Sequence, residues 1–225
     1  MNTLPSYLII NPNTTALVTD RLQGLGLEML APATLHAVTA PFGAPYISTE
    51  VACAVAGHAT WQAWQTASAQ WPIDAVLIGC FGDPGLFALR EAAGVPVTGL
   101  AEASFMAAQA IGPYGIVTGG RAWGPMLQRL ALSLPSGRDL LGIETVELDG
   151  ASLSARPAEA EQLLTQACVN LLKRSPVKSI IIGGAGLAGW AERLQSYFPI
   201  PLIDSVDAGL RRLLTISQPA SESSS

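Results

Sequence analysis

The sequence predicts an α/β fold of two pseudo-symmetric lobes, each a parallel sheet flanked by helices, with an active-site cleft between the lobes. Short apolar segments bounded by Gly, Pro and Asp alternate with longer helical patterns along nearly the whole chain. Alternation of this kind, with unbroken Val, Ile and Leu runs in the strands, indicates buried parallel sheets. The order of segments then occurs a second time, which predicts two lobes of similar build.

The predicted strands are short apolar runs. They are Tyr7–Ile10, Leu35–Thr39, Ala75–Gly79, Val95–Thr98, Tyr114–Thr118, Ile143–Leu148, Ser179–Gly183 and Ile200–Ile203. The predicted helices are the longer stretches between them, in which apolar residues recur at helical spacing. They cover residues 15–29, 48–69, 85–93, 101–110, 122–133, 157–174, 187–197 and 205–215.

Segments of the first half have counterparts in the second half. Residues 74–82 resemble 178–186 at an offset of 104, residues 94–98 resemble 199–203 at 105, and residues 7–11 resemble 114–118 at 107. Any two βαβ units share Gly and Val, but three matches in one order at nearly one offset favour a duplication. We expect a first lobe of residues 1–98 plus 205–216, a second lobe of 99–204, and a disordered tail over the small, polar residues 217–225.

Composition excludes several classes of function. The chain has 225 residues, which suits two compact lobes, and a formal net charge of −5 without a basic stripe, which argues against nucleic-acid binding. No apolar run is long enough to span a bilayer and no signal peptide is recognisable, so we expect a cytoplasmic protein without a membrane partner. Only 13% of the residues are charged, which suggests that part of the surface is buried in a homo-oligomer.

The cysteines, histidines and lysines limit the cofactor chemistry. Cys53, Cys80 and Cys168 are odd in number and far apart, which argues against a disulfide framework. With two histidines and no CxxC pair, the chain offers almost nothing for a structural zinc site. Two lysines, neither in a predicted pocket, argue against a pyridoxal-phosphate Schiff base. We therefore expect neither a metal nor an organic cofactor.

The candidate site is the set of loops that follow the strands. In open parallel sheets a ligand lies beyond the carboxyl ends of the strands, and two facing lobes place those ends on opposite walls of one cleft. The segments that we expect to face a common small-molecule substrate are Asn11–Thr14, Cys80–Gly82, Thr118–Gly120 and Gly184–Gly186.

Five stretches carry a family resemblance. Ile10–Thr14 reads INPNT, Gly79–Leu86 reads GCFGDPGL, Gly99–Ser104 reads GLAEAS, Ile116–Gly120 reads IVTGG and Pro201–Asp204 reads PLID. In this order they resemble the hydantoin racemase branch of the aspartate/glutamate racemase superfamily. The resemblance implies a cofactor-independent racemase that moves a proton at a carbon alpha to a carbonyl, with one cysteine on each wall of the cleft. It also implies that Asn13, Thr14, Thr118 and Gly119 hold the substrate carbonyls.

The sequence departs from that family at the second cysteine. The family motif Gly-Cys-Ala-Gly here reads Gly183-Gly184-Ala185-Gly186, so one thiol is missing. Three outcomes follow. Water, or a displaced side chain such as that of Ser205, protonates the far face; or a single thiol performs one-sided chemistry, as a malonate-type decarboxylase would; or the site binds a ligand without turnover.

Cys80 is the predicted catalytic thiol. It follows an apolar strand and precedes a Gly-Asp-Pro-Gly turn into a helix, where backbone N–H groups and the helix dipole would stabilise a thiolate. A thiolate is a usable base for a proton alpha to a carbonyl. The alternative is a small buried hydrophobe, which is the usual fate of cysteine and the one that we expect for Cys53 and Cys168, both in helical patterns.

The other predicted site residues have both a binding and a structural interpretation. Asn11, Asn13 and Thr14 either bind an anion or carbonyl or cap the next helix, and Thr118 and Gly119 form either an oxyanion-binding turn or a plain loop. Phe81 either covers a flat ring or packs on the sheet. Beside them we expect Gly82 to let the chain approach the ligand, and Gly184, Ala185 and Gly186 to line the opposite wall. Asp83 is expected to shape its turn, Asp204 and Asp207 to cap the last helix, and His36 and His58 to be structural or surface residues.

A dinucleotide site is the main rival interpretation. Gly184–Gly189 reads GxGxxG, follows a predicted strand, opens a helix and has Asp204 about 20 residues further on, as the dinucleotide fingerprint requires. Only about 20 residues follow Asp204, too few to complete a dinucleotide-binding fold that begins there. The duplication also accounts for the same glycines.

Overall fold

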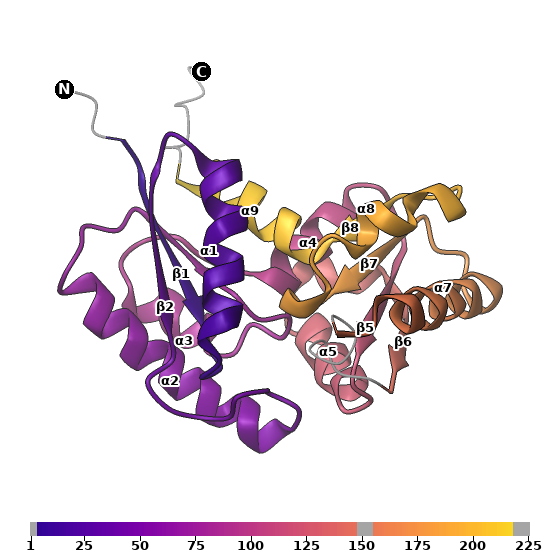
Figure 1. The fold of residues 1–225 in the computed structure, drawn as a ribbon, viewed down its shortest axis with the longest axis horizontal. Coiled ribbons are helices and arrows are strands. Elements are labelled where there is room, and N and C mark those ends of the chain that lie inside the picture. Colours follow the sequence, from indigo (N-terminus) through magenta and orange to yellow (C-terminus); the bar gives the residue numbers. More distant parts are fainter. Residues whose placement is uncertain (1–3, 148–154, 218–225) are drawn as a thin grey trace.

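The computed structural model describes residues 4–147 and 155–217 and contains two four-stranded sheets with helices on both faces (Figure 1). The strand order is β2-β1-β3-β4 in the first sheet and β6-β5-β7-β8 in the second, and every paired strand is parallel. The predicted fold class of two similar parallel α/β units is confirmed.

The elements of the first half run from β1 to α4. In chain order they are β1 (Ser6–Asn11), α1 (Ala16–Leu30), β2 (Thr34–Thr39), α2 (Glu50–Ser68), β3 (Ala75–Ile78), α3 (Leu86–Ala92), β4 (Val97–Gly99) and α4 (Leu100–Gln109). The central strands β1 and β3 are buried along their whole length, which explains their unbroken apolar sequences.

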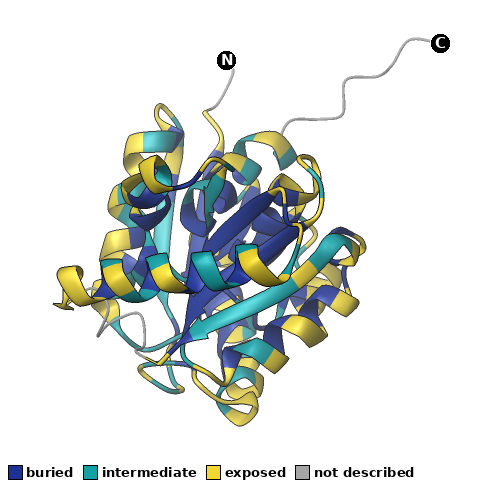
Figure 2. Ribbon diagram, turned by 90° about the vertical axis from the view of Figure 1, so that its right-hand side faces the viewer, coloured by how far each residue is buried: buried dark blue, intermediate teal, exposed yellow. Residues whose placement is uncertain are grey.

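The elements of the second half run from β5 to α9. They are β5 (Tyr114–Gly119), α5 (Trp123–Leu132), the 3-10 helix η1 (Pro135–Asp139), β6 (Leu140–Val146), α7 (Pro157–Arg174), β7 (Ser179–Gly183), η2 (Ala185–Leu187), α8 (Trp190–Leu194), η3 (Gln195–Tyr197), β8 (Leu202–Asp204) and α9 (Ser205–Ile216). Again the central strands, β5 and β7, are fully buried, and the helices turn exposed faces outward (Figure 2).

Several predicted boundaries were wrong. The strand expected at 143–148 is β6, an edge strand that begins at Leu140 and is mostly half-exposed, so it lacks a continuous apolar run; residue 148 lies outside the described residues. The helix expected at 187–197 is divided into η2, α8 and η3, because Gly189 adopts a left-handed conformation (φ 87°) between the first two. The strands expected from Val95 and from Ile200 begin at Val97 and Leu202. Of the tail expected at 217–225, Ser217 ends α9, and residues 218–225 lie outside the described part.

The backbone repeats where the sequence repeats. Gly85 and Gly189, which are 104 residues apart, are both left-handed, with φ 87° in each, and each precedes a short helix after the third strand of its sheet. A local conformation that favours glycine therefore occurs at equivalent positions of the two halves.

The two helices that follow the last strands cross between the halves. The helix α9 ends the second half but packs on β3 and β4 of the first sheet and on the helix α1. The helix α4 ends the first half but packs on β7 and η1 of the second half (Figure 1). Gly209 permits the crossing, because a Cβ there would lie 2.7 Å from Leu100 and 3.1 Å from Leu77. We propose to divide the chain accordingly, between residues 98 and 99 and between 204 and 205.

The cores of the two lobes are continuous at their contact. Phe105 of α4 is fully buried, and its ring lies 6.3 Å from that of Phe81 and 5.8 Å from that of Tyr114. First-lobe and second-lobe side chains thus belong to one apolar cluster. Within the described residues, no helix has both the length and the apolar character needed to cross a membrane.

Candidate active site

The turn after β3 contacts the second lobe at the end of β7 and at the start of α5. Within the sheets, the Gly79 N–H donates to the Ile10 carbonyl (2.8 Å) and the Thr118 hydroxyl donates to the Gly183 carbonyl (2.7 Å). Between the lobes, a side chain at Gly183 would overlap the Phe81 ring. The turn that carries Cys80 therefore lies directly against the second lobe.

Cys80 is partly exposed, and its turn is closed by its own carbonyl. The N–H groups of Gly82 and Asp83 both donate to the Cys80 carbonyl oxygen, at 3.0 and 3.1 Å. These two N–H groups therefore do not point at the sulfur. Burial raises the pKa of the Cys80 thiol well above its ordinary value, and the neighbouring Cys53 and Asp83 raise it further. These two amides therefore do not supply the predicted stabilisation of a thiolate, and burial favours the neutral form of the thiol.

The two residues after Cys80 pack on the second lobe. Phe81 is 4% exposed and lies between Gly183 and the edge of the Phe105 ring, so its ring is part of the core and does not face open space. Gly82 lies against Trp123 at the start of α5, where any side chain would overlap the indole. Of the two interpretations of Phe81, the structure favours packing.

The polar residues after β1 bind mainly to one another. The buried Asn11 amide donates to Asn13 Oδ1 (3.0 Å), to the Thr15 carbonyl (3.1 Å) and to the Thr19 hydroxyl (3.1 Å). Asn13 Oδ1 also accepts from Thr15 N–H (2.9 Å), and Thr14 N–H donates to the Ala44 carbonyl (3.2 Å). Asn11 thus shapes the loop, and Asn13 and Thr14 remain half-exposed at its surface.

Two donors at the end of β5 are also engaged. Thr118 is buried and its hydroxyl binds Gly183, and Gly120 N–H donates to the Val146 carbonyl (2.8 Å). Gly119 is buried within the end of β5. The predicted oxyanion-binding turn would need these donors to be released.

Gly184 occupies the place of the absent thiol in a conformation that favours glycine. Its φ is 134°, and a Cβ there would meet only Leu187, at 3.8 Å, so space is available. Its N–H donates to Ser205 Oγ (3.0 Å), and Ser205 is fully buried at the start of α9. Ala185 and Gly186 begin η2, and Arg21 of α1 donates to the carbonyl oxygens of Gly186 (3.3 Å) and Ala188 (2.8 Å), which joins the lobes beside this turn.

Asp204, the acidic residue of the dinucleotide fingerprint, is already hydrogen-bonded within the protein. One carboxylate oxygen of Asp204 accepts from Val206 N–H (2.8 Å) and the other from Gly189 N–H (2.6 Å), so the carboxylate caps α9 and binds the glycine-rich segment itself. A ribose would have to displace these bonds. Moreover, the helix that follows Gly189 spans only Trp190–Leu194.

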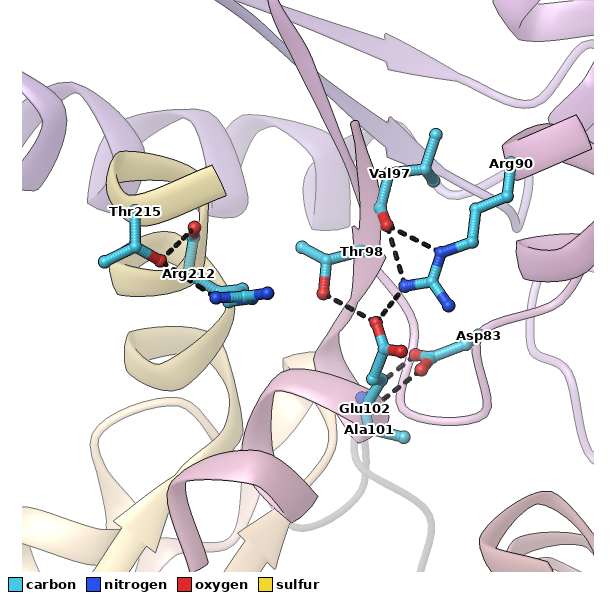
Figure 3. A network of polar contacts seen from close by, with 8 residues as sticks. All are labelled: Asp83, Arg90, Val97, Thr98, Ala101, Glu102, Arg212 and Thr215. Carbon is cyan, nitrogen blue, oxygen red and sulfur yellow. Dashed lines mark hydrogen bonds and ion pairs between the residues drawn. The ribbon is translucent and has the colours of Figure 1, made fainter. Parts of the chain in front are cut away.

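Asp83 is the residue that sequence reasoning undervalued. It is 3% exposed, and it binds the N-terminus of α4 rather than only shaping its own turn (Figure 3). Burial raises its pKa to about 7, although the Ala101 and Glu102 N–H bonds act in the opposite direction. The signal that could have identified it is the α4 N-cap, Gly99, which has no side chain with which to cap the helix.

A cavity with a volume of about 590 Å³ lies between α2, α3 and α5. Cys53, His58, Gly82, Asp83 and Trp123 are among its lining residues, and an ion pair between Glu50 and Arg129 (2.6 Å) joins α2 to α5 beside it. Of the predicted site residues only Gly82 lines this cavity, whereas Cys80 is in the same turn but not in its wall. Sequence reasoning therefore missed that Cys53 faces a space shared by both lobes. Cys168, in contrast, is fully buried in the second lobe, and burial raises its pKa to about 12.

Residues 4–147 and 155–217 contain no cluster of three or more His, Cys, Asp or Glu side chains that could hold a metal ion.

Comparison with known proteins agrees with this architecture. A family model described as Asp/Glu/Hydantoin racemase matches residues 8–213. A hydantoin racemase from Paenarthrobacter aurescens is 29% identical over 206 residues, which cover 91% of this chain and 87% of that protein. An allantoin racemase structure from Klebsiella pneumoniae has a TM-score of 0.85 at 25% identity and covers 98% of this chain and 96% of its own. A double mutant of arylmalonate decarboxylase, with one glycine changed to cysteine and one cysteine to serine, shares the fold, with a TM-score of 0.71 at 14% identity over 96% of this chain and 94% of its own.

The family match covers nearly all of the described residues and both sheets. The resemblance drawn from the sequence motifs is therefore confirmed, and so is the predicted enzyme class, an isomerase of the racemase type. The chain belongs to the Asp/Glu/hydantoin racemase family.

Proposed function

We propose that this enzyme moves a proton at a carbon alpha to a carbonyl, on a hydantoin-like or amino-acid-derived substrate and without a cofactor, with Cys80 as its thiol acid and base. The observation that carries the proposal is the position of Cys80: it is a partly exposed thiol directly after β3, on a turn that packs against the second lobe. Similarity over nearly the whole chain to a hydantoin racemase and an allantoin racemase supports the substrate class.

The reaction has two proton transfers. The Cys80 thiolate removes the proton on the alpha carbon, and the electron pair of that C–H bond delocalises onto the carbonyl oxygen as an enolate. A proton returned to the same face regenerates the substrate, whereas a proton delivered to the opposite face gives the other enantiomer. A thiol with a raised pKa is a strong base once ionised, and its protonated form is the acid needed for the reverse step.

Delivery to the opposite face needs a donor near Gly184. We assign it to a water molecule in the space that a cysteine side chain would occupy, where the nearest atoms to a Cβ are those of Leu187 at 3.8 Å. Ser205 is the second candidate, because its oxygen accepts the Gly184 N–H and its own O–H can still donate. It is fully buried, however, so the water is the simpler donor.

Hydrogen exchange in D₂O tests the role of Cys80. Deuterium incorporation at the alpha carbon of hydantoins, allantoin and free amino acids would be followed by NMR for the wild type, Cys80→Ser and Cys53→Ser. We expect Cys80→Ser to lower exchange by about 10²-fold or more, and Cys53→Ser to retain it. Loss in Cys53→Ser with retention in Cys80→Ser would move the chemistry to the cavity between α2 and α5.

A one-thiol lyase is the second candidate, favoured by the absence of a side chain at Gly184. Such an enzyme would release CO₂ from a malonate-type acid, and Cys80 would protonate the resulting enolate from one face. Product from a prochiral aryl malonate would then be a single enantiomer, and a racemic product would exclude this candidate. Ligand-dependent thermal stabilisation without any turnover would instead identify a binding protein.

A further inference from the structure

α4 has no cap of its own and takes one from another segment. Its N-cap is Gly99, and Asp83, located between β3 and α3, supplies the missing carboxylate. Asp83 Oδ1 accepts from Ala101 N–H (2.9 Å) and Oδ2 accepts from Glu102 N–H (2.8 Å) (Figure 3). A Cβ at position 99 would overlap this carboxyl group, so the loop aspartate occupies the place of an N-cap side chain.

The second lobe makes the same connection from the opposite end. The counterpart of Gly99 at the offset of 105 is Asp204, the N-cap of α9, which binds Val206 N–H and Asp207 N–H directly. Its other oxygen accepts from Gly189 N–H (2.6 Å), in the loop after β7. In each lobe one carboxylate therefore joins the loop after the third strand to the N-terminus of the helix after the fourth strand.

The Asp83 connection is built into the turn that carries Cys80. Asp83 N–H donates to the Cys80 carbonyl (3.1 Å), and only two residues lie between Cys80 and Asp83, whose carboxyl binds α4. Asp83 has φ 47° and is the one residue other than glycine with a positive φ in the described chain. A left-handed aspartate is tolerated where its side chain is hydrogen-bonded, which suits this turn.

Neighbouring charges do not form a direct ion pair with Asp83. Glu102 forms an ion pair with Arg90 and accepts from the Thr98 hydroxyl (3.0 Å), and Arg90 also donates to the Val97 carbonyl (2.8 Å) (Figure 3). The Asp83 carboxyl is thus held by backbone amides of α4, the helix that packs on β7 of the second lobe.

We propose that Asp83 is a positioning residue for the reaction of Cys80: it fixes the Cys80 turn on α4 and thereby sets the thiol relative to the second-lobe turn at Gly184. The proposal rests on the proposed function of Cys80. A misplacement of a reacting group by about 1 Å can cost about 10²-fold in rate, which is the scale of effect expected when this connection is lost.

Asp83→Asn is the primary variant, since asparagine tolerates the left-handed backbone but places an NH₂ group against one of the two α4 N–H groups. The matched control is Asp74→Asn, which removes a carboxylate that accepts Ser6 N–H (2.7 Å) just before β3, at the end opposite Cys80. For exchange per folded molecule, we expect kcat to fall about 10- to 100-fold in Asp83→Asn with KM nearly unchanged, and kcat to stay within about twofold in Asp74→Asn.

Rescue separates positioning from simple loss of stability. The double variant Asp83→Gly/Gly99→Asp moves the carboxylate from the loop to the helix N-cap, the position that Asp204 has in the second lobe, and leaves at position 83 a residue that tolerates the left-handed backbone. We expect it to recover part of the kcat lost in Asp83→Gly, whereas Gly99→Asp alone, in which two carboxyl groups compete for one place, is destabilised. Unchanged kcat in folded Asp83→Asn would overturn the proposal.

A readout without substrate distinguishes failure of this proposal from failure of the proposed function. Alkylation of Cys80 by iodoacetamide, measured in a Cys53→Ser/Cys168→Ser background, should be faster in Asp83→Asn at a given pH, because the turn is released and a negative charge is removed. An identical alkylation profile in both proteins would overturn the positioning role. Exchange that survives in Cys80→Ser would instead refute the proposed catalytic function of Cys80.

Discussion

At the scale of single residues, the state of Cys80 depends on where neighbouring amides point. Its place after a buried strand was predictable, but the Gly82 and Asp83 amides bind the Cys80 carbonyl instead of the sulfur. Burial then dominates, and it favours the neutral thiol. We therefore expect a bound substrate, rather than this turn, to favour ionisation of the thiol.

The raised pKa of Cys80 predicts how deuterium exchange depends on pH. Because the Cys80 pKa is raised, the thiolate fraction is small at neutral pH and grows with pH, so kcat/KM for deuterium incorporation should still be rising above pH 8.5, near the ordinary thiol pKa. Rates from pH 6 to 10, corrected with Cys80→Ser for spontaneous exchange, would check this. A plateau reached below about pH 8 would contradict it.

Position 184 allows the missing thiol to be restored. Gly184→Cys has space for its Cβ but must accept φ 134°, so we expect it to lose about 1–3 kcal/mol of stability. Gly184→Ala carries the same strain without the sulfur and is the matched control. Racemisation followed by polarimetry should be faster in Gly184→Cys than in Gly184→Ala, and equal rates would show that a second thiol cannot reach the substrate.

At the scale of elements, the sequence predicted strands better than irregular helices. β1, β3, β5 and β7 are central strands with all residues buried, so their apolar runs are unambiguous. β6 is an edge strand and α8 a single short helix, and neither has a pattern strong enough to set its boundaries. The contact between Gly183 and Phe81 could not be foreseen either, because it joins residues of different lobes.

Overpacking at that contact tests the interface between β7 and the Cys80 turn. Gly183→Ala places a methyl group in the Phe81 ring and should lower the free energy of unfolding by about 1–3 kcal/mol in urea titrations. Gly24→Ala on α1 is the control, since a Cβ there meets nothing within 4 Å, and it should be neutral or stabilising by up to about 1 kcal/mol. Equal stabilities of the two variants would mean that the lobes can shift apart freely.

At the scale of the whole molecule, the lobes are joined by exchanged helices, one shared apolar cluster and polar contacts such as Arg21 with Gly186. The duplicated sequence predicted two lobes facing each other. It did not predict that a cavity lined by both lobes lies beside α2 and α5, with Cys53 in its wall.

Stability should depend on pH through Asp83. Its pKa is about 7 in the folded protein and about 3.9 in an unfolded chain. Below about pH 4 the carboxyl is protonated in both states, and its contribution to the free energy of unfolding is fully present. Between about pH 4 and 7 the unfolded chain ionises first, so the free energy of unfolding falls, by at most about 4 kcal/mol.

Urea titrations at several pH values from 4 to 8 would measure this change. The curve of Asp83→Asn should be less steep over the same range, because asparagine does not titrate. Parallel curves for wild type and Asp83→Asn would show that the folded-state pKa of Asp83 is not raised.

The sequence alone determined the two parallel sheets, their duplication, the place of Cys80 after a strand and the absence of a second thiol at Gly184, because apolar periodicity and residue identity are local properties. Only the tertiary structure decided that Asp83 caps α4, that Ser205 binds Gly184, and that the polar groups of Asn11 and Thr118 are already engaged. Hydrogen-bond donors choose among acceptors brought close by folding. Residues far apart in the chain therefore set the state of a site whose position the sequence could indicate.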